Sequence, residues 1–256
     1  MIDSRAVIDP GAQIDSDVSV GPFVVIGAGV EIEKGTWIGP NVVIEGPTRI
    51  GRDNKIFPFA VIGGDPQDRK YGGEDTRLEI GDGNVIREYC SISRGTAQDQ
   101  GVTRIGDDNW IMAYVHIAHD CRVGAHTVFA NNATLAGHVE IEDYATLGGF
   151  TLVHQFCRIG AYAFSGMGTA ISKDVPPNIT VNGSPARARC LNTEGLARHG
   201  FGPDVIQELR QSYKTLYRSE LTLDQALFML RKQLLKCPEV ARLIEFLERP
   251  SRGVVR

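Results

Sequence analysis

Hydrophobic residues recur along this chain at every sixth position. Eleven successive positions from Ile2 to Ile62 are Ile or Val, and the spacing resumes after two interruptions and continues to Ile159. A helix repeats its apolar face about every 3.6 residues and a one-faced strand every 2, so neither explains the pattern. The marking positions are Ile2, Ile8, Ile14, Val20, Ile26, Ile32, Ile38, Ile44, Ile50, Ile56 and Ile62, then Ile80, Ile86 and Ile92, then Ile105, Ile111, Ile117, Val123, Phe129, Leu135, Ile141, Leu147, Val153 and Ile159.

Period six with β-branched residues predicts short flat strands joined by tight corners. Three such sides make a coil of eighteen residues, and stacked coils form a triangular parallel β-helix with the aliphatic residues inside. Gly or an acidic residue often follows a marking position, as at Gly21, Glu33 and Gly124. Because Gly, Asn and Asp tolerate positive φ, we expect them to form the corners. An ordinary β-sandwich with accidental spacing is the alternative.

Two polar, glycine-rich segments, 64–78 and 94–103, interrupt the period. We expect both to loop out of the prism, and loops on a rigid scaffold often carry function. The hexads stop near Pro185, which predicts a β-helix over 1–186 and a helical domain over 187–256.

Three helices are predicted in that C-terminal part. Pro203 suits the first turn of a helix that runs to about Arg218. Thr222 and Gln225 match a capping box at the start of a helix over Leu223–Leu235. A third helix is expected from Pro238 to about Glu248.

Composition excludes several classes of protein. With 42% hydrophobic residues among 256 and a net charge of −4, the chain is neither disordered nor broadly basic, which argues against nucleic acid as a partner. No apolar run approaches the roughly 18 residues of a membrane span, and the N-terminus lacks the apolar region of a signal peptide. The five cysteines are odd in number and form no CxxC pair, which predicts a cytoplasmic protein without a disulfide framework.

Charge is divided between the two parts of the chain. Residues 187–256 carry 13 Lys and Arg against 8 Asp and Glu, whereas residues 1–186 carry 14 against 23. A basic C-terminal part suits an acidic partner or substrate, although solvated helix faces explain the same excess.

Four histidines are predicted to share one corner of the prism. In the unbroken stretch 105–159, residues eighteen apart should stack about 4.8 Å from one another. On that basis His116, His119, His138 and His154 fall within five places of one another across three coils.

A glycine belongs to the same corner. Gly137 falls one coil above His119, and Gln155 falls one coil above Gly137. The group is open to three interpretations: a hydrated corner without chemistry, a zinc site made of three imidazoles, or a general-base site. In the last, a histidine takes a proton from an attacking hydroxyl, and the glycine N–H stabilises the oxyanion. Spacing alone does not separate the last two.

The motifs around these residues are specific beyond the hexad. Together they resemble the UDP-N-acetylglucosamine 3-O-acyltransferase family over essentially the whole chain. The segments that carry the resemblance are Gln67–Tyr71, His116–Cys121, Ala130–Val139, Val153–Cys157, Asn192–Leu196 and Ser251–Arg256.

The resemblance implies a left-handed β-helix and the first step of lipid A synthesis. In that reaction an (R)-3-hydroxyacyl chain passes from acyl carrier protein to the 3-hydroxyl of UDP-N-acetylglucosamine. It also implies a homotrimer with clefts between neighbouring prisms, no cofactor and no metal. The acidic carrier is expected to meet basic residues near the helical domain.

The resemblance also assigns roles to single residues. It implies that His119 is the general base, that Asp120 orients it, and that Gly137 donates its backbone N–H to the oxyanion. Met167 falls where the family places its acyl-length ruler, so its bulk is expected to shorten the accepted chain. Contacts to the sugar nucleotide or the acyl donor are implied for Asp68, Lys70, His116, His138, His154, Gln155, Asn192 and Arg198.

Three positions depart from the family pattern. Ser93 stands where a histidine is common, His199 where a second arginine is usual, and Asp75 in place of a proline. These departures leave open an amide-forming enzyme that acts on a 3-amino sugar nucleotide. A zinc-dependent hydratase like the γ-carbonic anhydrases and a non-catalytic scaffold are the alternatives from other classes.

Overall fold

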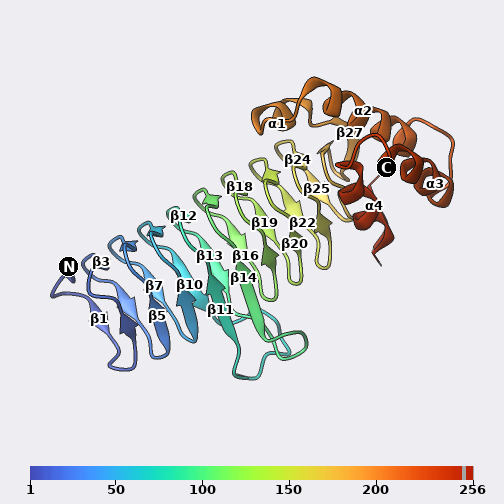
Figure 1. Ribbon diagram of the computed structural model, residues 1–256. Helices are drawn as coiled ribbons and strands as arrows, with labels where there is room; N and C mark the ends of the chain where they lie inside the picture. The colour runs from blue at the N-terminus through green and yellow to red at the C-terminus, as the bar shows by residue number, and fades with distance from the viewer. Residues whose placement is uncertain (250–251, 256) are drawn as a thin grey trace.

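The computed structural model describes residues 1–249 and 252–255. A long prism of short parallel strands leads into a helical region at the C-terminal end (Figure 1). The fold is a left-handed parallel β-helix followed by helices. The period predicted the parallel β-helix, and the resemblance implied its left hand. Among the described residues, no helix is both long and apolar enough to cross a membrane.

Three sheets form the sides of the prism, and we name them in the order in which the chain enters them. The first sheet contains β1 (Val7–Ile8), β4 (Val25–Ile26), β7 (Val43–Ile44), β10 (Val61–Gly64), β13 (Ser91–Ser93), β16 (His116–Ile117), β19 (Thr134–Leu135), β22 (Leu152–Val153) and β25 (Ala170–Ile171). The second contains β2 (Gln13–Ile14), β5 (Val30–Ile32), β8 (Thr48–Ile50), β11 (Arg77–Ile80), β14 (Val102–Ile105), β17 (Arg122–Val123), β20 (Glu140–Ile141) and β23 (Arg158–Ile159). The third contains β3 (Ser19–Val20), β6 (Trp37–Ile38), β9 (Lys55–Ile56), β12 (Val85–Ile86), β15 (Trp110–Ile111), β18 (Val128–Phe129), β21 (Thr146–Leu147), β24 (Phe164–Ser165), β26 (Ile179–Asn182) and β27 (Arg187–Leu191).

The predicted register is confirmed. Ile117 pairs with Leu135 and Leu135 with Val153, so eighteen residues return the chain to the same side of the prism. The marking residues from Val20 onward fill the interior, whereas Ile2 at the open N-terminal end is half exposed. Burial of these side chains supplies the stacking energy of the solenoid, at roughly 25 cal/mol per Å² of apolar surface.

The expectation about the corners was wrong in one respect. Most of the positive-φ corner residues that are not glycine are aromatic or His rather than Asn or Asp, as at Tyr89, His138 and Phe156. Many glycines that follow marking positions have ordinary φ and stand where successive coils approach closely. A Cβ on Gly148, for example, would lie 2.5 Å from the carbonyl oxygen of Ser165.

Both interruptions of the period are loops, and their ends fall within two residues of the predicted ones. They span 65–76, between β10 and β11, and 94–101, between β13 and β14. Both leave the prism at the corner between the first and second sheets and project from it together (Figure 1).

The C-terminal part differs from the prediction at its start. Residues 187–191 form β27, which pairs antiparallel with β26, so the helices begin only at Thr193. Its described helices are α1 (Thr193–Arg198), α2 (Pro203–Tyr217), α3 (Leu223–Leu234) and α4 (Val240–Glu248).

Three helices confirm the expected segments, and one was missed. The Thr222–Gln225 capping box is present, and the third predicted helix begins two residues later than expected, at Val240. The short helix α1 was not predicted, although Asn192 caps it. Residues 250, 251 and 256 of the predicted 187–256 domain lie outside the described residues, and 251 and 256 also belong to the Ser251–Arg256 segment that carries the resemblance.

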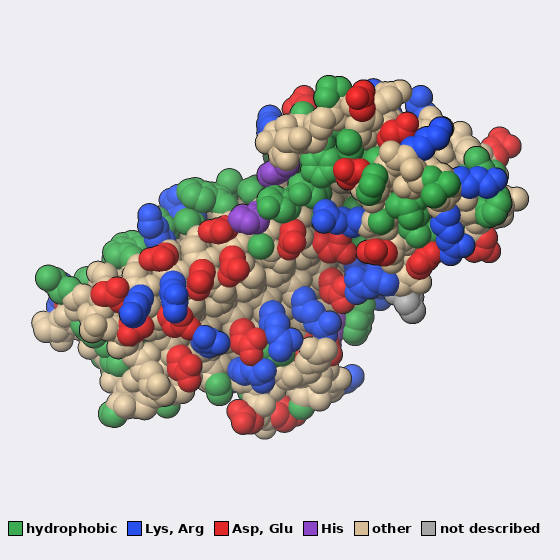
Figure 2. Space-filling model, in the orientation of Figure 1, with side chains coloured by type: hydrophobic (Ala, Val, Ile, Leu, Met, Phe, Trp, Pro, Cys, Tyr) green, Lys and Arg blue, Asp and Glu red, His purple; other side chains and the backbone are tan. Residues whose placement is uncertain are grey.

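Charged side chains cover the outer face of the second sheet and largely neutralise one another. Arg49 pairs with Glu33 at 2.6 Å, Arg104 with Glu79 at 2.9 Å, and Arg249 with Glu140 at 2.7 Å. Acidic and basic side chains accordingly lie interspersed along the visible flank of the prism (Figure 2). These exposed pairs add little stability, because solvent and salt screen them.

Candidate active site

The predicted histidine corner lies between the first and second sheets. His119 and Asp120 follow β16, and the two loops leave the same corner in the two coils below. Gly137 and His138 occupy it one coil above, and Gln155 and Phe156 follow one coil higher. Successive coils therefore bring residues far apart in sequence to one edge of the molecule.

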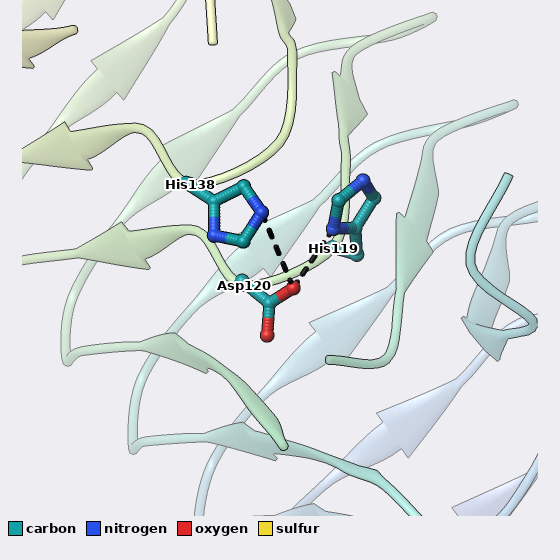
Figure 3. Close-up of side chains that lie close together, drawn as sticks. All are labelled: His119, Asp120 and His138. Carbon is teal, nitrogen blue, oxygen red and sulfur yellow. Dashed lines mark hydrogen bonds and ion pairs between the residues drawn. The ribbon is translucent and has the colours of Figure 1, made fainter. Parts of the chain in front are cut away.

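His119 and Asp120 form a hydrogen-bonded pair. Nδ1 of His119 lies 2.8 Å from Oδ2 of Asp120, whose side chain is buried (Figure 3). His138 faces the same carboxylate, with Nε2 at 3.8 Å, and its ring meets that of His119 edge to face at 5.1 Å. Burial raises the pKa of Asp120, but hydrogen bonds from His119 and Thr96 outweigh it, so the pKa lies below its usual value. The carboxylate is therefore ionised at neutral pH.

Gly137 lies directly against the His119 ring. A Cβ at this position would be 2.5 Å from Cε1 and 2.7 Å from Nε2 of His119, so only glycine fits without a shift of the ring. The backbone N–H of Gly137 donates to no other group among the described residues. This N–H is therefore available to a ligand beside the imidazole.

A cavity of about 750 Å³ opens over this corner. Five of the predicted site residues, Asp68, Lys70, His119, His138 and Gln155, line it together. The complete lining is Gln67, Asp68, Arg69, Lys70, Gln98, Asp99, His119, His138, Gln155 and Phe156.

His116 lies at the edge of this site, on β16. Its Nδ1 is 2.7 Å from Oγ of Ser91, its neighbour on β13. Burial lowers the pKa of His116, and the nearby His119 lowers it further, against a smaller opposing effect of Ser91. His116 is therefore a neutral imidazole at physiological pH, able to donate or accept a hydrogen bond.

His154 lines a different cavity, on the outer face of the first sheet. This groove of about 530 Å³ is mostly apolar and begins at Ala136, next to Gly137. Its lining is Thr134, Ala136, Leu152, Val153, His154, Ala170, Ile171, Ser172, Ser184 and Pro185. Ala136 and His154 directly precede Gly137 and Gln155 of the site corner, so the apolar groove lies next to that corner.

Asn192 and Arg198 do not join the other predicted residues within one chain. They line a cavity of about 1040 Å³ between the third sheet and the helices, together with Arg189, Arg210 and Lys214. Both amide atoms of Asn192 have structural partners, since Oδ1 accepts from the Gly195 N–H and Nδ2 donates to the Tyr162 carbonyl. Arg198 is exposed beside Glu194.

Met167 also lies apart from the histidine corner. It follows β24 at the corner that leads into β25, and its side chain is 79% exposed. It does not line the cavity over His119 or the apolar groove.

Several residues of the corner escaped the sequence analysis. Thr96 bonds to Asp120, Asp99 bonds to His138 at 3.1 Å, and Phe156 stacks on His138 with ring centroids 4.4 Å apart. Phe156 stands eighteen residues after His138, so the stacking rule could have found it. Thr96 and Asp99 belong to a loop, and nothing in the period indicates where a loop residue points.

The departures from the family pattern lie in diverse surroundings. Ser93 is buried at the end of β13, and Asp75 is exposed in the 65–76 loop. His199 packs edge-on against Tyr144 and Tyr162, where it joins the helical region to the prism.

One group among the described residues could hold a metal ion. It consists of His119, Asp120 and His138, whose ligand atoms lie within 4.8 Å of one another. Two imidazoles and a carboxylate differ from the three imidazoles considered above, and the carboxylate oxygens already accept hydrogen bonds from Thr96 and His119.

Comparisons with known proteins agree over the whole chain. The family model "Udp N-acetylglucosamine O-acyltransferase; Domain 2" matches residues 174–255, and the bacterial transferase hexapeptide model matches residues 29–64 and 103–137.

Similar curated proteins are full-length matches. An acyl-(acyl-carrier-protein)–UDP-N-acetylglucosamine O-acyltransferase of Alkalilimnicola ehrlichii is 56% identical over 255 residues, which cover 100% of this chain and 99% of that protein. The protein of the same name from Thiobacillus denitrificans is 53% identical with the same coverage.

Solved structures are also similar over the full length of the chain. LpxA from Acinetobacter baumannii superposes with a TM-score of 0.98 at 48% identity, covering 100% of this chain and 99% of that chain. An Arabidopsis UDP-N-acetylglucosamine acyltransferase gives a TM-score of 0.87 at 37% identity with complete coverage of both chains.

Proposed function

The chain belongs to the UDP-N-acetylglucosamine O-acyltransferase family, and on that premise we propose the reaction that it catalyses. It moves an (R)-3-hydroxyacyl chain from acyl carrier protein to the 3-hydroxyl of UDP-N-acetylglucosamine, the first step of lipid A synthesis. The observation that carries this proposal is the His119–Asp120 pair with the N–H of Gly137 beside it, which has no acceptor among the described residues.

His119 acts as the general base. The Asp120 carboxylate accepts a hydrogen bond from Nδ1–H of His119. This bond favours the tautomer in which Nε2 is unprotonated. Nε2 then takes the proton of the sugar hydroxyl as its oxygen attacks the thioester carbonyl. The same proton passes to the departing thiol when the tetrahedral intermediate collapses. The ionised Asp120 stabilises the imidazolium in between.

The N–H of Gly137 stabilises the oxyanion of that intermediate. The N–H of Gly137 lies beside the imidazole of His119. When the sugar hydroxyl held by His119 attacks the thioester carbonyl, the carbonyl oxygen is therefore near this donor. Asp68, Lys70, His116, His138 and Gln155 bind the sugar nucleotide around it, and the Lys70 ammonium suits a diphosphate.

The apolar groove on the first sheet holds the acyl chain. It begins at Ala136 and passes His154, so a thioester at Gly137 can extend its hydrocarbon along Leu152 and Ala170. Its apolar wall favours methylene groups, each worth about 0.8 kcal/mol when buried.

Met167 limits the length of that chain in our proposal. It does not line the groove of its own chain, so in this role it acts on the groove of a neighbouring chain in the assembly proposed below. Met167→Gly is expected to raise kcat/KM for a donor two to four carbons longer by about tenfold relative to the preferred donor, because the obstructing side chain is removed. Carrier-bound 3-hydroxyacyl chains of graded length, assayed against wild type and variant, measure this. An unchanged preference contradicts the ruler role.

The relatives' names support the O-acyltransferase and neither the amide-forming enzyme nor the zinc hydratase. The direct test incubates purified protein with carrier-bound 3-hydroxyacyl chains and either UDP-N-acetylglucosamine or its 3-amino analogue, with products identified by mass spectrometry. We expect ester formation with the hydroxyl acceptor. Absence of product with every donor overturns the proposal, and exclusive use of the amine overturns its acceptor.

We further propose that the enzyme is a homotrimer and that each site is shared by two chains. This is supported by the placement of Asn192 and Arg198, which line a cavity on the third sheet while the His119 corner opens on another side. In a ring of three chains, one face of each prism meets a different face of the next. The third-sheet cavity of one chain then completes the site of its neighbour.

Mixing two impaired variants tests the shared site. His119→Ala and Arg198→Ala trimers, dissociated and reassembled together, are expected to recover about a quarter of wild-type sites, because some interfaces then pair two intact halves. Light scattering should give three times the 27.9 kDa chain mass. Activity of the mixture that merely averages the two variants contradicts a shared site.

The partners that we propose are acyl carrier protein and the sugar nucleotide, with no role for nucleic acid. Basic residues of the third-sheet cavity, including Arg189, Arg210 and Lys214, suit the acidic carrier. The proposed location is the cytoplasm, as the cysteine usage predicted.

A further inference from the structure

The loop 94–101 makes direct contact with the His119–Asp120 pair. The N–H of Thr96 donates to Oδ1 of Asp120 at 2.9 Å, and its hydroxyl donates to Oδ2 at 2.6 Å. Thr96 is only 1% exposed. A single residue of the loop therefore holds both oxygens of the carboxylate that orients His119.

The loop 94–101 lies one coil below Asp120, at the same corner of the prism. β13 and β14 flank it, so it replaces the corner of the coil directly below Asp120. At an uninterrupted corner a backbone N–H alone can reach the carboxylate one coil above, as the N–H of Ala125 does to Oδ1 of Asp143 at 2.8 Å. In the inserted loop, Thr96 supplies both its N–H and its hydroxyl to the carboxylate of Asp120.

The backbone of Asp120 is also held in place. The N–H of Asp120 donates to Oγ1 of Thr103 at 2.8 Å. Oδ2 is shared between the Thr96 hydroxyl and Nδ1 of His119. Rotation of the carboxylate about its Cβ–Cγ bond therefore breaks the bonds to Thr96 and to His119 together.

The loop itself is held firmly. The buried guanidinium of Arg94 donates to the carbonyl of Gly63 at 2.6 Å, to the hydroxyl of Tyr71 at 3.1 Å and to the carboxylate of Asp65. Arg94 thus ties the loop 94–101 to the loop 65–76, which carries Asp68 and Lys70. A residue held this way can impose an orientation on Asp120.

We propose that Thr96 is a positioning residue for the acyl transfer, acting through Asp120 on His119. The inference rests on the proposed function, since it assigns His119 as the base. Through its hydroxyl, Thr96 keeps the Asp120 carboxylate in the plane that accepts from Nδ1 of His119, so that Nε2 faces the substrate. A base displaced by about 1 Å loses about 100-fold in rate, which sets the scale of the effect.

Variants at Thr96 separate the hydroxyl from the shape of the side chain. Thr96→Val keeps the shape and removes the hydroxyl, and Thr96→Ser and Thr96→Ala differ from each other only by that hydroxyl. We expect kcat to fall about 10- to 100-fold in the Val and Ala variants, with KM for both substrates within about twofold of wild type. In the Ser variant we expect kcat to be close to the wild-type value.

Thr76→Val is the matched control. Thr76 is also buried, in the neighbouring loop, but its hydroxyl has no hydrogen-bond partner among the described residues. Removal of an unpaired buried hydroxyl is neutral or stabilising, so this variant should keep wild-type kcat.

A spectroscopic measurement needs no turnover. In protein labelled with ¹⁵N-histidine, the Nδ1–H of His119 bonded to a carboxylate should give a downfield proton signal, assigned by its loss in His119→Ala. We expect this signal in wild type, Thr96→Ser and Thr76→Val, and its loss or shift in Thr96→Val and Thr96→Ala.

The outcomes separate this inference from the proposed function. Wild-type kcat and an unchanged His119 signal in folded Thr96→Val or Thr96→Ala overturn the role of Thr96, whatever the reaction is. If the wild-type protein transfers no acyl group, the proposed function fails, and the His119 signal alone decides whether Thr96 orients the pair. Should Thr96→Val not fold, the Ser and Ala pair gives the same comparison.

Discussion

Replacement of His119 by alanine is expected to lower kcat by about 10³- to 10⁴-fold, the scale of a general base whose removal leaves the sugar hydroxyl protonated during attack. Nδ1 of His119 is hydrogen-bonded to the buried carboxylate of Asp120. The His119 side chain is 14% exposed, so the ring presents Nε2 to the cavity. His138 lies against the same carboxylate, but at 3.8 Å it makes no hydrogen bond to it. It is therefore not expected to replace the missing base.

The measurement is single-substrate kinetics at saturating sugar nucleotide, with circular dichroism to show that the β-helix is intact. His126→Ala is the matched control, because His126 lies at another corner, where it stacks on Tyr144 and is 43% exposed. It should keep kcat within about twofold of wild type. A His119→Ala enzyme that turns over at the wild-type rate would remove the general-base assignment.

Alanine at position 137 is expected to lower kcat by about 10²- to 10³-fold, comparable to the loss of an oxyanion donor. The added methyl group would lie 2.5 Å from Cε1 of His119, so the imidazole must move away from the oxyanion position. The φ of Gly137 is not in the left-handed region, so the backbone itself accepts alanine. The expected loss is therefore in the chemical step rather than in folding.

The control for this change is Gly27→Ala. A Cβ on Gly27 would meet its nearest neighbour, the Ile44 carbonyl oxygen, at 3.5 Å, an ordinary contact far from the site along the prism. Both variants should melt within a few degrees of wild type, and only Gly137→Ala should lose activity. Equal activities in the two variants would show that the His119 ring has room to relax and that the glycine is not required.

Much of the site could be predicted from spacing because a solenoid turns distance along the chain into position in space. The coil length fixes which residues stack, so His119, Gly137 and Gln155 could be placed on one corner before any coordinates. Phe156 could have been found by the same rule. The residue types at the corners were harder to predict. Aromatic residues disfavour a positive φ, but stacking between rings one coil apart compensates for it. Tyr89 and Tyr114, for example, both have a positive φ, and their rings lie 4.9 Å apart.

By itself the sequence determined the register of the prism, its aliphatic interior and the corner that carries the histidines, since each follows from a constant coil length. Only the tertiary structure decided what lies over that corner. The loop residues Thr96 and Asp99 reach Asp120 and His138 along paths that no period encodes, and Asn192 and Arg198 lie on another face because the helical region folds back against the third sheet. Contacts between successive coils recur at a fixed spacing of eighteen residues, so they can be predicted from the sequence. The contacts of Thr96, Asp99, Asn192 and Arg198 depend instead on how irregular segments pack against the prism.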